Sequence, residues 1–183
     1  MPSKIKIEIR AELRDPQGKL IKRYPWKKAN SLLKQFIQIL MVQMSTVAQN
    51  TTDTGGVERS LTISSQNFNS AGAAALTTNG VVVGSGTTPV SMTDTKLQTQ
   101  VTTNVAHSAH SLAVENPDAS TWRVYIARVF TNNTGATLQI REVGLYCFGA
   151  GSTWNFAIDH TLYSVDVPNG VGVTITYRIT ISL

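Results

Sequence analysis

The sequence lacks the residues that staple a small domain covalently. It contains a single cysteine, Cys147, among 183 residues, which excludes a disulfide framework within the chain. A chain of this length can bury a sizeable hydrophobic core as one domain without a metal or a disulfide. We therefore expect packing and backbone pairing to provide its stability. The alternation of Cys147 with Val143 and Leu145 predicts a small core residue.

Long hydrophobic runs are also missing. The longest apolar cluster, residues 36–44, is interrupted by Gln38 and Gln43 and is far shorter than the roughly 20 residues of a membrane span. The first 15 residues alternate charged and aliphatic side chains, without the continuous apolar centre of a signal peptide. The sequence thus predicts a soluble, unprocessed protein with no membrane partner.

Charge is scarce and unevenly distributed. Charged residues make up 15% of the chain and the formal net charge is +5. Residues 1–34 hold ten basic against three acidic residues, a local balance of +7, whereas the remainder holds six against eight, a balance of −2. Such a segment fits a solvated face, which we favour, an acidic partner or nucleic acid. The candidate contacts with an acidic partner are Lys4, Lys6, Arg10, Lys22, Arg23, Lys27 and Lys28.

The N-terminal segment predicts a β-hairpin. Residues 3–15 alternate aliphatic and charged side chains, which is the period of a half-buried strand. Asp15-Pro16-Gln17-Gly18 fits a type I turn, and residues 19–26 would return as the second strand. The Lys and Arg side chains along both strands are typical of an edge that resists unwanted pairing.

One amphipathic helix is predicted over residues 31–45. After Trp26 the apolar spacing changes from two to 3.6 residues, and Asn30 or Ser31 can cap the start. The predicted apolar stripe consists of Leu33, Phe36, Ile37, Leu40, Met41 and Met44. It either covers the sheet or docks on another subunit. The candidate intersubunit contacts are Leu33, Phe36, Ile37, Leu40 and, from the next segment, Phe68.

Residues 46–80 are rich in Thr, Ser, Asn, Gly and Ala, so they cannot build a core alone. We expect a long loop with one short strand near residues 61–63, ordered by a neighbouring molecule. In domain terms, residues 1–50 form a basic hairpin and helix that pack on a sandwich. Residues 51–183 form the sandwich that carries this loop.

Regularly spaced strands follow. They are predicted at residues 80–86, 121–133, 137–148, 154–164 and 171–183. No helical pattern lies between them, which favours antiparallel strands over βαβ units. Residues 132–135 predict a tight hairpin and residues 168–170 another turn. The predicted fold class is therefore mainly β, an antiparallel β-sandwich that is jelly-roll-like, with an N-terminal β-hairpin and one α-helix.

The sequence contains no strong pattern of phosphate-binding, metal-binding or catalytic residues. Gly84-Ser85-Gly86 follows a strand, but no Gly-Lys-Ser/Thr comes after it and Pro89 opposes the helix that a phosphate loop needs. We interpret it as a turn, with a second, side-chain-capped turn at residues 91–95.

Other chemistry has equally little support. The pair His107 and His110 lacks further ligands for zinc. Asp159-His160 has no serine elbow, and Glu142 has no partner carboxylate at a readable spacing. We predict no catalytic, cofactor-binding or metal-binding residue.

Three segments carry a resemblance. They read VVVGSGTTPVSMTDTKLQ at 81–98, VFTNNTGATLQIREVGLYCF at 129–148 and TLYSVDVPNGVGVTITYRITIS at 161–182. Their succession resembles virion structural proteins of tailed bacteriophages and related prokaryotic viruses, of the capsid-decorating or the tail and baseplate type. The hairpin and helix at the N-terminus are similar to the opening of such proteins. About half the chain is covered, and the EVGLY hairpin is the most specific element.

The resemblance implies a non-enzymatic virion protein, made in the host cytoplasm. Its expected partners are copies of itself, in a homo-oligomer, and other virion proteins such as the major capsid or tail proteins. Head decoration is the first expectation, and a tail, baseplate or fibre component is the alternative. Two other classes stay open: a basic nucleic-acid-binding module, and a carbohydrate-binding sandwich with Trp122 or Trp154 as an exposed platform.

Overall fold

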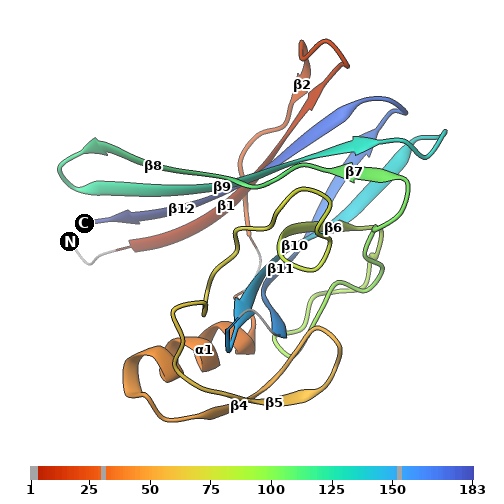
Figure 1. The fold of residues 1–183 in the computed structure, drawn as a ribbon. Coiled ribbons are helices and arrows are strands. Elements are labelled where there is room, and N and C mark those ends of the chain that lie inside the picture. Colours follow the sequence, from red (N-terminus) through yellow and green to blue (C-terminus); the bar gives the residue numbers. More distant parts are fainter. Residues whose placement is uncertain (1–3, 30–31, 152–153) are drawn as a thin grey trace.

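The computed structural model describes residues 4–29, 32–151 and 154–183. Nearly all regular structure is β (Figure 1). The elements are β1 (Lys4–Arg14), β2 (Leu20–Arg23), β3 (Lys27–Lys28), α1 (Lys34–Ser45), β4 (Gln49–Thr52), β5 (Glu58–Leu61), β6 (Gly80–Gly84), β7 (Val105–His107), β8 (Ser111–Asp118), β9 (Thr121–Asn132), β10 (Leu138–Gly149), β11 (Trp154–Val167) and β12 (Gly172–Ser182).

The strands form three antiparallel sheets. The large sheet has the order β2-β1-β12-β9-β7, with β3 on β1 and β8 on β9; the small sheet has the order β11-β10-β6; and β4 pairs with β5. The small sheet lies against part of the large one, and α1 with the β4-β5 hairpin lies at the far end of the small sheet (Figure 1). The predicted antiparallel sandwich with an N-terminal hairpin and a single described helix is confirmed.

The core lies between the large sheet and the small sheet, where the two face each other. Alternate residues of β1 and β12, among them Ile9, Val173 and Ile175, meet Val143 and Phe156 of the small sheet, and all five are fully buried. Face-to-face packing of two sheets is the usual way in which antiparallel strands bury their apolar sides. Cys147 is buried in this core, as its alternation predicts, and burial raises the pKa of its thiol to about 12.

The N-terminal hairpin forms as predicted, but it belongs to the large sheet. β1 pairs with β12 over its whole length, from Lys4 opposite Ser182 to Arg14 opposite Gly172. In the turn, the Asp15 carboxylate accepts hydrogen bonds from the amides of Gln17 and Lys19. The hairpin is therefore an integral edge of the sandwich rather than a unit packed on it, because its aliphatic face is needed in the core.

The predicted hairpin at residues 132–135 is wrong. β9 belongs to the large sheet and β10 to the small one, so this turn carries the chain between layers. The Asn132 side chain holds the corner: its Nδ2 donates to the carbonyls of Ala136 and Val167, and its Oδ1 accepts from the amide and hydroxyl of Thr134. The turn at residues 168–170 returns the chain from β11 to β12, and Gly135 N donates to Asn169 Oδ1 to join the two corners.

The helix is confirmed, but its predicted buried face is not. α1 begins at Lys34, and Leu33 occupies the N-cap position without a side-chain cap; Asn30 and Ser31 lie outside the described residues. The buried helical residues are Gln35, Ile39 and Val42, because α1 packs against β4 and β11. The predicted stripe is rotated away from this contact, so that Ile37, Met41 and Met44 are exposed by 49%, 48% and 78%.

Residues 46–80 are held by the chain itself. They contain the β4-β5 hairpin, so the short strand ends at Leu61 instead of covering residues 61–63. Asn67 then donates to Gln43 Oε1 and accepts from the amide of Ala150. Deep in the sandwich, the buried guanidinium of Arg128 donates to the backbone carbonyls of Ala73, Leu76, Asn79 and Val81 and to that of Ser108, which follows β7. A polar sequence that cannot form a core is thus ordered by buried hydrogen bonds from neighbouring strands.

Candidate assembly surface

The large sheet extends well past the small one. We call this extension the wing, and it consists of residues 4–9 of β1, 177–182 of β12, 121–126 of β9 and the whole of β8. The wing projects beside the body and carries both described chain ends at its tip (Figure 1). It is one pleated layer with two faces, so the side chains on each face decide what it can contact.

One face of the wing is entirely apolar. Residues directly opposite in an antiparallel ladder share a face, so the strand register defines three rows across the sheet. The rows are Ile5, Ile181 and Trp122; Ile7, Ile179, Val124 and Val114; and Ile9, Tyr177, Ile126 and Leu112. We call these residues the wing face. None of these described wing-face residues is charged.

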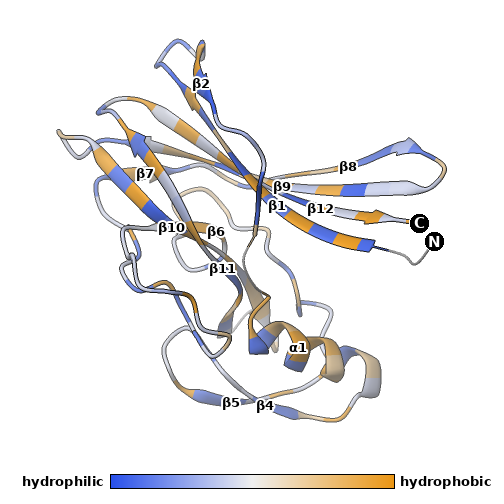
Figure 2. Cartoon of the chain, turned by 180° about the vertical axis from the view of Figure 1, so that it is seen from behind, coloured by the Kyte–Doolittle hydropathy of each residue, from blue (hydrophilic) through white to orange (hydrophobic). Residues whose placement is uncertain are grey.

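The wing face is the outward continuation of the core. Ile9 and Tyr177 are fully buried at the inner row, whereas Ile181, Trp122 and Ile5 at the outer row are exposed by 49%, 54% and 71%. Figure 2 shows the alternating apolar bands that run out along β1 and β12. The apolar alternation of the large sheet therefore continues past the point where the small sheet ends. The outer rows have no covering layer within the chain.

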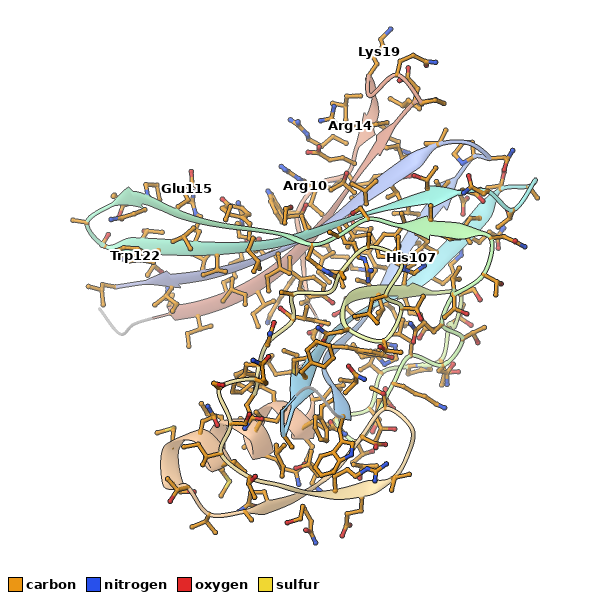
Figure 3. All side chains as sticks on the ribbon, in the orientation of Figure 1. Arg10, Arg14, Lys19, His107, Glu115 and Trp122 are labelled. Carbon is orange, nitrogen blue, oxygen red and sulfur yellow. The ribbon has the colours of Figure 1, made fainter. Side chains whose placement is uncertain are left out.

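The opposite face of the wing is charged and internally satisfied. Glu8 accepts from Arg178 at 2.6 Å and from Lys6 at 2.7 Å. Trp26 lies between the guanidinium groups of Arg178 and Arg10, at 4.0 and 4.4 Å from its ring centroid. In Figure 3, Glu115 and Trp122 project from opposite sides of the wing. The wing thus has one solvated face and one face that resembles an interior.

An apolar groove runs between the wing face and α1. It has a volume of about 330 Å³ and is lined by the wing residues Ile5, Ile7, Ile179, Ile181 and Tyr177, by Leu32, Phe36 and Leu40, and by Leu145, Ile158 and Asp159 of the small sheet. The side chains of Phe36 and Leu40 therefore form one wall of the groove, and the wing forms the other.

Asp159 is the acid of this groove and is almost fully buried. Its Oδ2 accepts hydrogen bonds from Tyr177 at 2.8 Å and Thr161 at 3.0 Å, whereas its Oδ1 has no partner among the described residues. Burial raises the pKa of Asp159 to about 7. Burial thus favours the protonated form of this carboxyl group at pH values where an ordinary aspartate is ionised.

The predicted intersubunit contacts divide into three groups. Leu33 is fully buried, with Val82, Leu97, Tyr146 and Ala157 around it, so its prediction as an intersubunit contact is wrong. Phe36 packs on Phe68 with ring centroids 5.4 Å apart, and both are partly buried. Ile37 is exposed, and Leu40 is partly buried beside Phe36 in the groove wall.

Three of the seven predicted contacts with an acidic partner are paired with the chain's own acids. Glu12 binds Arg10 at 3.0 Å and Arg23 at 2.8 Å, and Lys6 binds Glu8. Lys27 Nζ donates to the carbonyl of Leu162 at 3.1 Å, and Lys22 lies over the ring of Tyr24. Lys4 and Lys28 are exposed. The positive charge of the hairpin is therefore partly neutralised within the sheet.

Sequence reasoning missed the outer part of the wing. β8 was not predicted, because Asn116 and Pro117 interrupt its alternation. Its free edge is nevertheless long, and all eight of its residues are exposed. The signal that would have revealed it is the pair Leu112 and Val114, which continues the alternation of β9.

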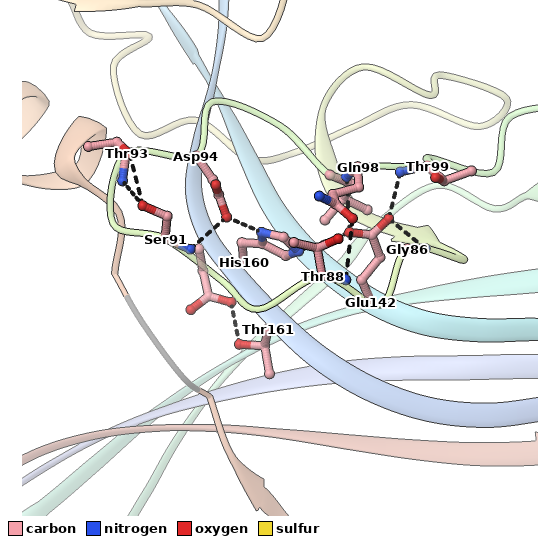
Figure 4. A network of polar contacts seen from close by, with 12 residues as sticks. Gly86, Thr88, Ser91, Thr93, Asp94, Gln98, Thr99, Glu142, His160 and Thr161 are labelled. Atoms are coloured by element: carbon pink, nitrogen blue, oxygen red, sulfur yellow. Dashed lines mark hydrogen bonds and ion pairs between the residues drawn. The ribbon is translucent and has the colours of Figure 1, made fainter.

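A buried Glu-His-Asp cluster lies elsewhere, in the small sheet. His160 Nε2 is 2.9 Å from Glu142 Oε2, and His160 Nδ1 is 2.8 Å from Asp94 Oδ2 (Figure 4). Glu142 also accepts from the backbone amides of Gly86, Gln98 and Thr99 at 3.0, 3.0 and 2.8 Å. These bonds tie the loop that follows β6 onto β10 and β11.

The pKa shifts in this cluster are those of buried, mutually hydrogen-bonded groups. We call the cluster the clamp, because it holds the loop after β6 on β10 and β11. Burial alone would raise the pKa of Glu142, but the hydrogen bonds from His160 and the three amides outweigh it and lower that pKa. Burial alone would lower the pKa of His160, whereas the two carboxylates raise it. Glu142 is fully buried and His160 is 1% exposed.

The glycine corner at residues 84–86 is part of the same clamp. A Cβ atom on Gly84 or Gly86 would lie 2.4 or 2.6 Å from Glu142 Oε1, so both glycines are needed for the loop to reach the carboxylate. The second turn forms as predicted, with Asp94 N donating to Ser91 O and Ser91 N to Asp94 Oδ2. The motif that superficially suggests a phosphate loop therefore binds an internal carboxylate.

The two spaced histidines have separate structural settings. His107 packs edge-on against Phe130 at 5.1 Å, and burial lowers its pKa to about 4. His110 Nε2 accepts a hydrogen bond from the amide of Val81. Across the described ranges, no group of three or more His, Cys, Asp or Glu residues is placed to hold a metal ion.

Comparison of the chain with models of protein families, with curated proteins and with solved structures gave no match. No described helix has the length and apolar character needed to cross a membrane.

Proposed function

We propose that this protein is a non-enzymatic structural component of the virion of a tailed bacteriophage or related prokaryotic virus. Head decoration, as a minor capsid protein, is our first placement, and a tail, baseplate or fibre position is the second. The observation that carries the proposal is the wing face, an interior-like surface built into the sheet and left without a covering layer. Large exposed apolar patches on folded proteins mark interaction surfaces.

The three motifs of the resemblance support this proposal by their structural roles. Glu142 belongs to the EVGLY segment, and the amide of Gly86 that binds it belongs to the motif at residues 81–98. The turns at Asn132 and Asn169 carry the chain between the two layers. Each motif is explained by folding. The sequence features that characterise the resemblance thus maintain a scaffold, which suits a protein that presents a surface.

The direct test is particle composition. Particles of the virus that encodes the chain would be purified on a density gradient and washed in high salt, and their proteins identified by mass spectrometry. We expect the chain to be present in many copies, and labelled antibodies to decorate a fixed position in electron micrographs. Its absence from washed particles would contradict the proposal.

The nucleic-acid alternative makes a different prediction. A protein that binds DNA through phosphate contacts loses affinity steeply as salt rises, through counterion release. The pairing of Arg10 and Arg23 with Glu12 and of Lys6 with Glu8 favours weak binding. A DNA titration at low salt that gave tight binding with a steep salt dependence would favour the alternative.

A carbohydrate-binding function is not favoured, because the row of Ile5, Ile181 and Trp122 is apolar and has no polar side chain to orient a sugar.

A further inference from the structure

We propose that the wing face binds the wing face of a second copy of this chain, so that two wings form one inter-subunit sandwich. This inference rests on the proposed function, because it names the partner that binds the same surface. The geometry points to a second copy because the wing lacks a layer of the kind that the chain itself provides. Over the inner half of the large sheet, that layer is the small sheet.

The first step is the shape of the missing layer. Two antiparallel sheets pack well when both present alternating apolar side chains across several strands. The wing offers four hydrogen-bonded strands, from β1 through β12 and β9 to β8, with one register shift in β8 between Glu115 and Asp118. A second wing presents the same rows at the same spacing. Two wings placed face to face around a two-fold axis would therefore interdigitate as the two layers of the core do.

The second step is the size of the surface. Six residues of the wing face are exposed by 37–71%: Ile5, Leu112, Val114, Trp122, Val124 and Ile181. An exposed apolar patch made of several neighbouring side chains marks an interaction site, and a stable dimer buries about 800 Å² on each partner. The groove wall of Phe36 and Leu40 adjoins this patch and enlarges the surface that a second copy can bury.

The third step is charge. The wing face contains no charged residue, so two copies meet without like charges in contact. The opposite face carries Lys6, Arg123 and Arg178 beside Glu8 and Glu115, and pairing it with itself would bring those charges together. Of the two faces, only the apolar one is complementary to its own copy. A two-fold pairing is also the commonest arrangement among homo-oligomers.

The test uses two neighbouring residues of β8 on opposite faces. Val114 is 66% exposed and belongs to the wing face, whereas Ala113 is exposed and belongs to the charged face. The full chain would be analysed by sedimentation velocity over a wide concentration range. We expect the wild type to sediment as a dimer, Val114→Lys to weaken dimerisation at least tenfold, and Ala113→Lys to behave as the wild type. Circular dichroism would verify that both variants are folded.

Cysteine crosslinking supplies an independent readout. Single cysteines would be placed in turn at Leu112, Val114 and Val124 on the wing face. In a two-fold dimer a cysteine near the axis lies close to its own copy, so we expect at least one of these positions to form an intermolecular disulfide on mild oxidation, while a cysteine at Ala113 would not. The native Cys147 is fully buried and gives no background in the folded protein. A crosslinking pattern that is equal on both faces would overturn the pairing.

The outcomes separate this inference from the proposed function. A wild-type protein that is monomeric at high concentration overturns the pairing; if particles contain it and Val114→Lys prevents its incorporation, the occupant is another virion protein. A dimer that Val114→Lys leaves intact also overturns the pairing, because the interface then lies elsewhere. A dimer that dissociates as expected, in a protein absent from washed particles, retains the pairing and removes the virion assignment.

Discussion

Single buried polar residues determine the loops of this protein. Glu142 receives four hydrogen bonds, from His160 and from three backbone amides. No sequence pattern revealed this role, because Glu142 has no partner carboxylate at a recognisable spacing and its hydrogen-bond partners lie 18 to 56 residues away. Buried charge is retained only when it is paired and hydrogen-bonded, so the sequence alone predicts neither the burial nor the partners.

Replacing Glu142 by glutamine is expected to lower the free energy of unfolding by about 3–5 kcal/mol, the usual consequence of breaking a buried ion pair. The amide removes the negative charge opposite His160 and turns one acceptor into a donor that faces backbone N–H groups. Urea unfolding measures the loss. The matched control is Glu58→Gln in β5, an exposed position at which we expect a change below about 0.5 kcal/mol. Equal stability of the two variants would contradict the clamp.

Asp159 predicts a pH dependence of opposite sign to that of an ordinary carboxylate. Burial raises its pKa from 3.8 to about 7, so between these values the folded chain holds a proton that the unfolded chain releases. Stability therefore falls as pH rises through this window, by up to about 4 kcal/mol at 1.36 kcal/mol per pKa unit.

Urea unfolding at several pH values between 4 and 8 checks the sign. Asp159→Asn is expected to be less sensitive to rising pH than the wild type, and the difference between the two isolates the Asp159 contribution from that of His160. Asp166→Asn, an exposed aspartate on β11 paired with Arg141, should keep the wild-type slope. A wild type whose stability is no more pH-dependent than that of Asp159→Asn would show that Asp159 ionises normally.

At the scale of elements, alternation predicted strands well and their partners poorly. The five strands expected beyond residue 80 all form, close to their predicted ends. Period-two alternation identifies a half-buried strand locally, but it does not say to which sheet the strand belongs. This is why residues 132–135 were mistaken for a hairpin. The helix face was misjudged for a related reason, because burial of α1 depends on where β4 and β11 lie.

The corner at Asn132 is a testable element. Its side chain makes hydrogen bonds to Ala136, Val167 and Thr134 and is fully buried. Asn132→Ala is expected to lower the free energy of unfolding by about 2–3 kcal/mol, because it removes the donor to the buried carbonyl of Val167 and the acceptor for Thr134. Asn133→Ala is the control, since Asn133 is exposed and its contact with Asn104 uses the backbone amide. Equal effects in thermal or urea unfolding would show that the corner does not depend on the side chain.

At the scale of the whole molecule, the sheet is larger than its own core requires. The sequence predicted the sandwich and the helix. It did not predict the wing, because an uncovered apolar row and a buried one have the same alternation. The difference arises only from the length of the small sheet, which stops short of Ile5, Ile181 and Trp122.

The central claim is that the wing face is covered when the protein is assembled. Electron cryomicroscopy of the native particle, at a resolution that shows side chains, tests it most directly. The account predicts many ordered copies of the chain, with the rows of β1, β12, β9 and β8 packed against the same rows of a second copy. Particles in which the chain is present but Trp122, Val124 and Ile181 face solvent in every copy would contradict it.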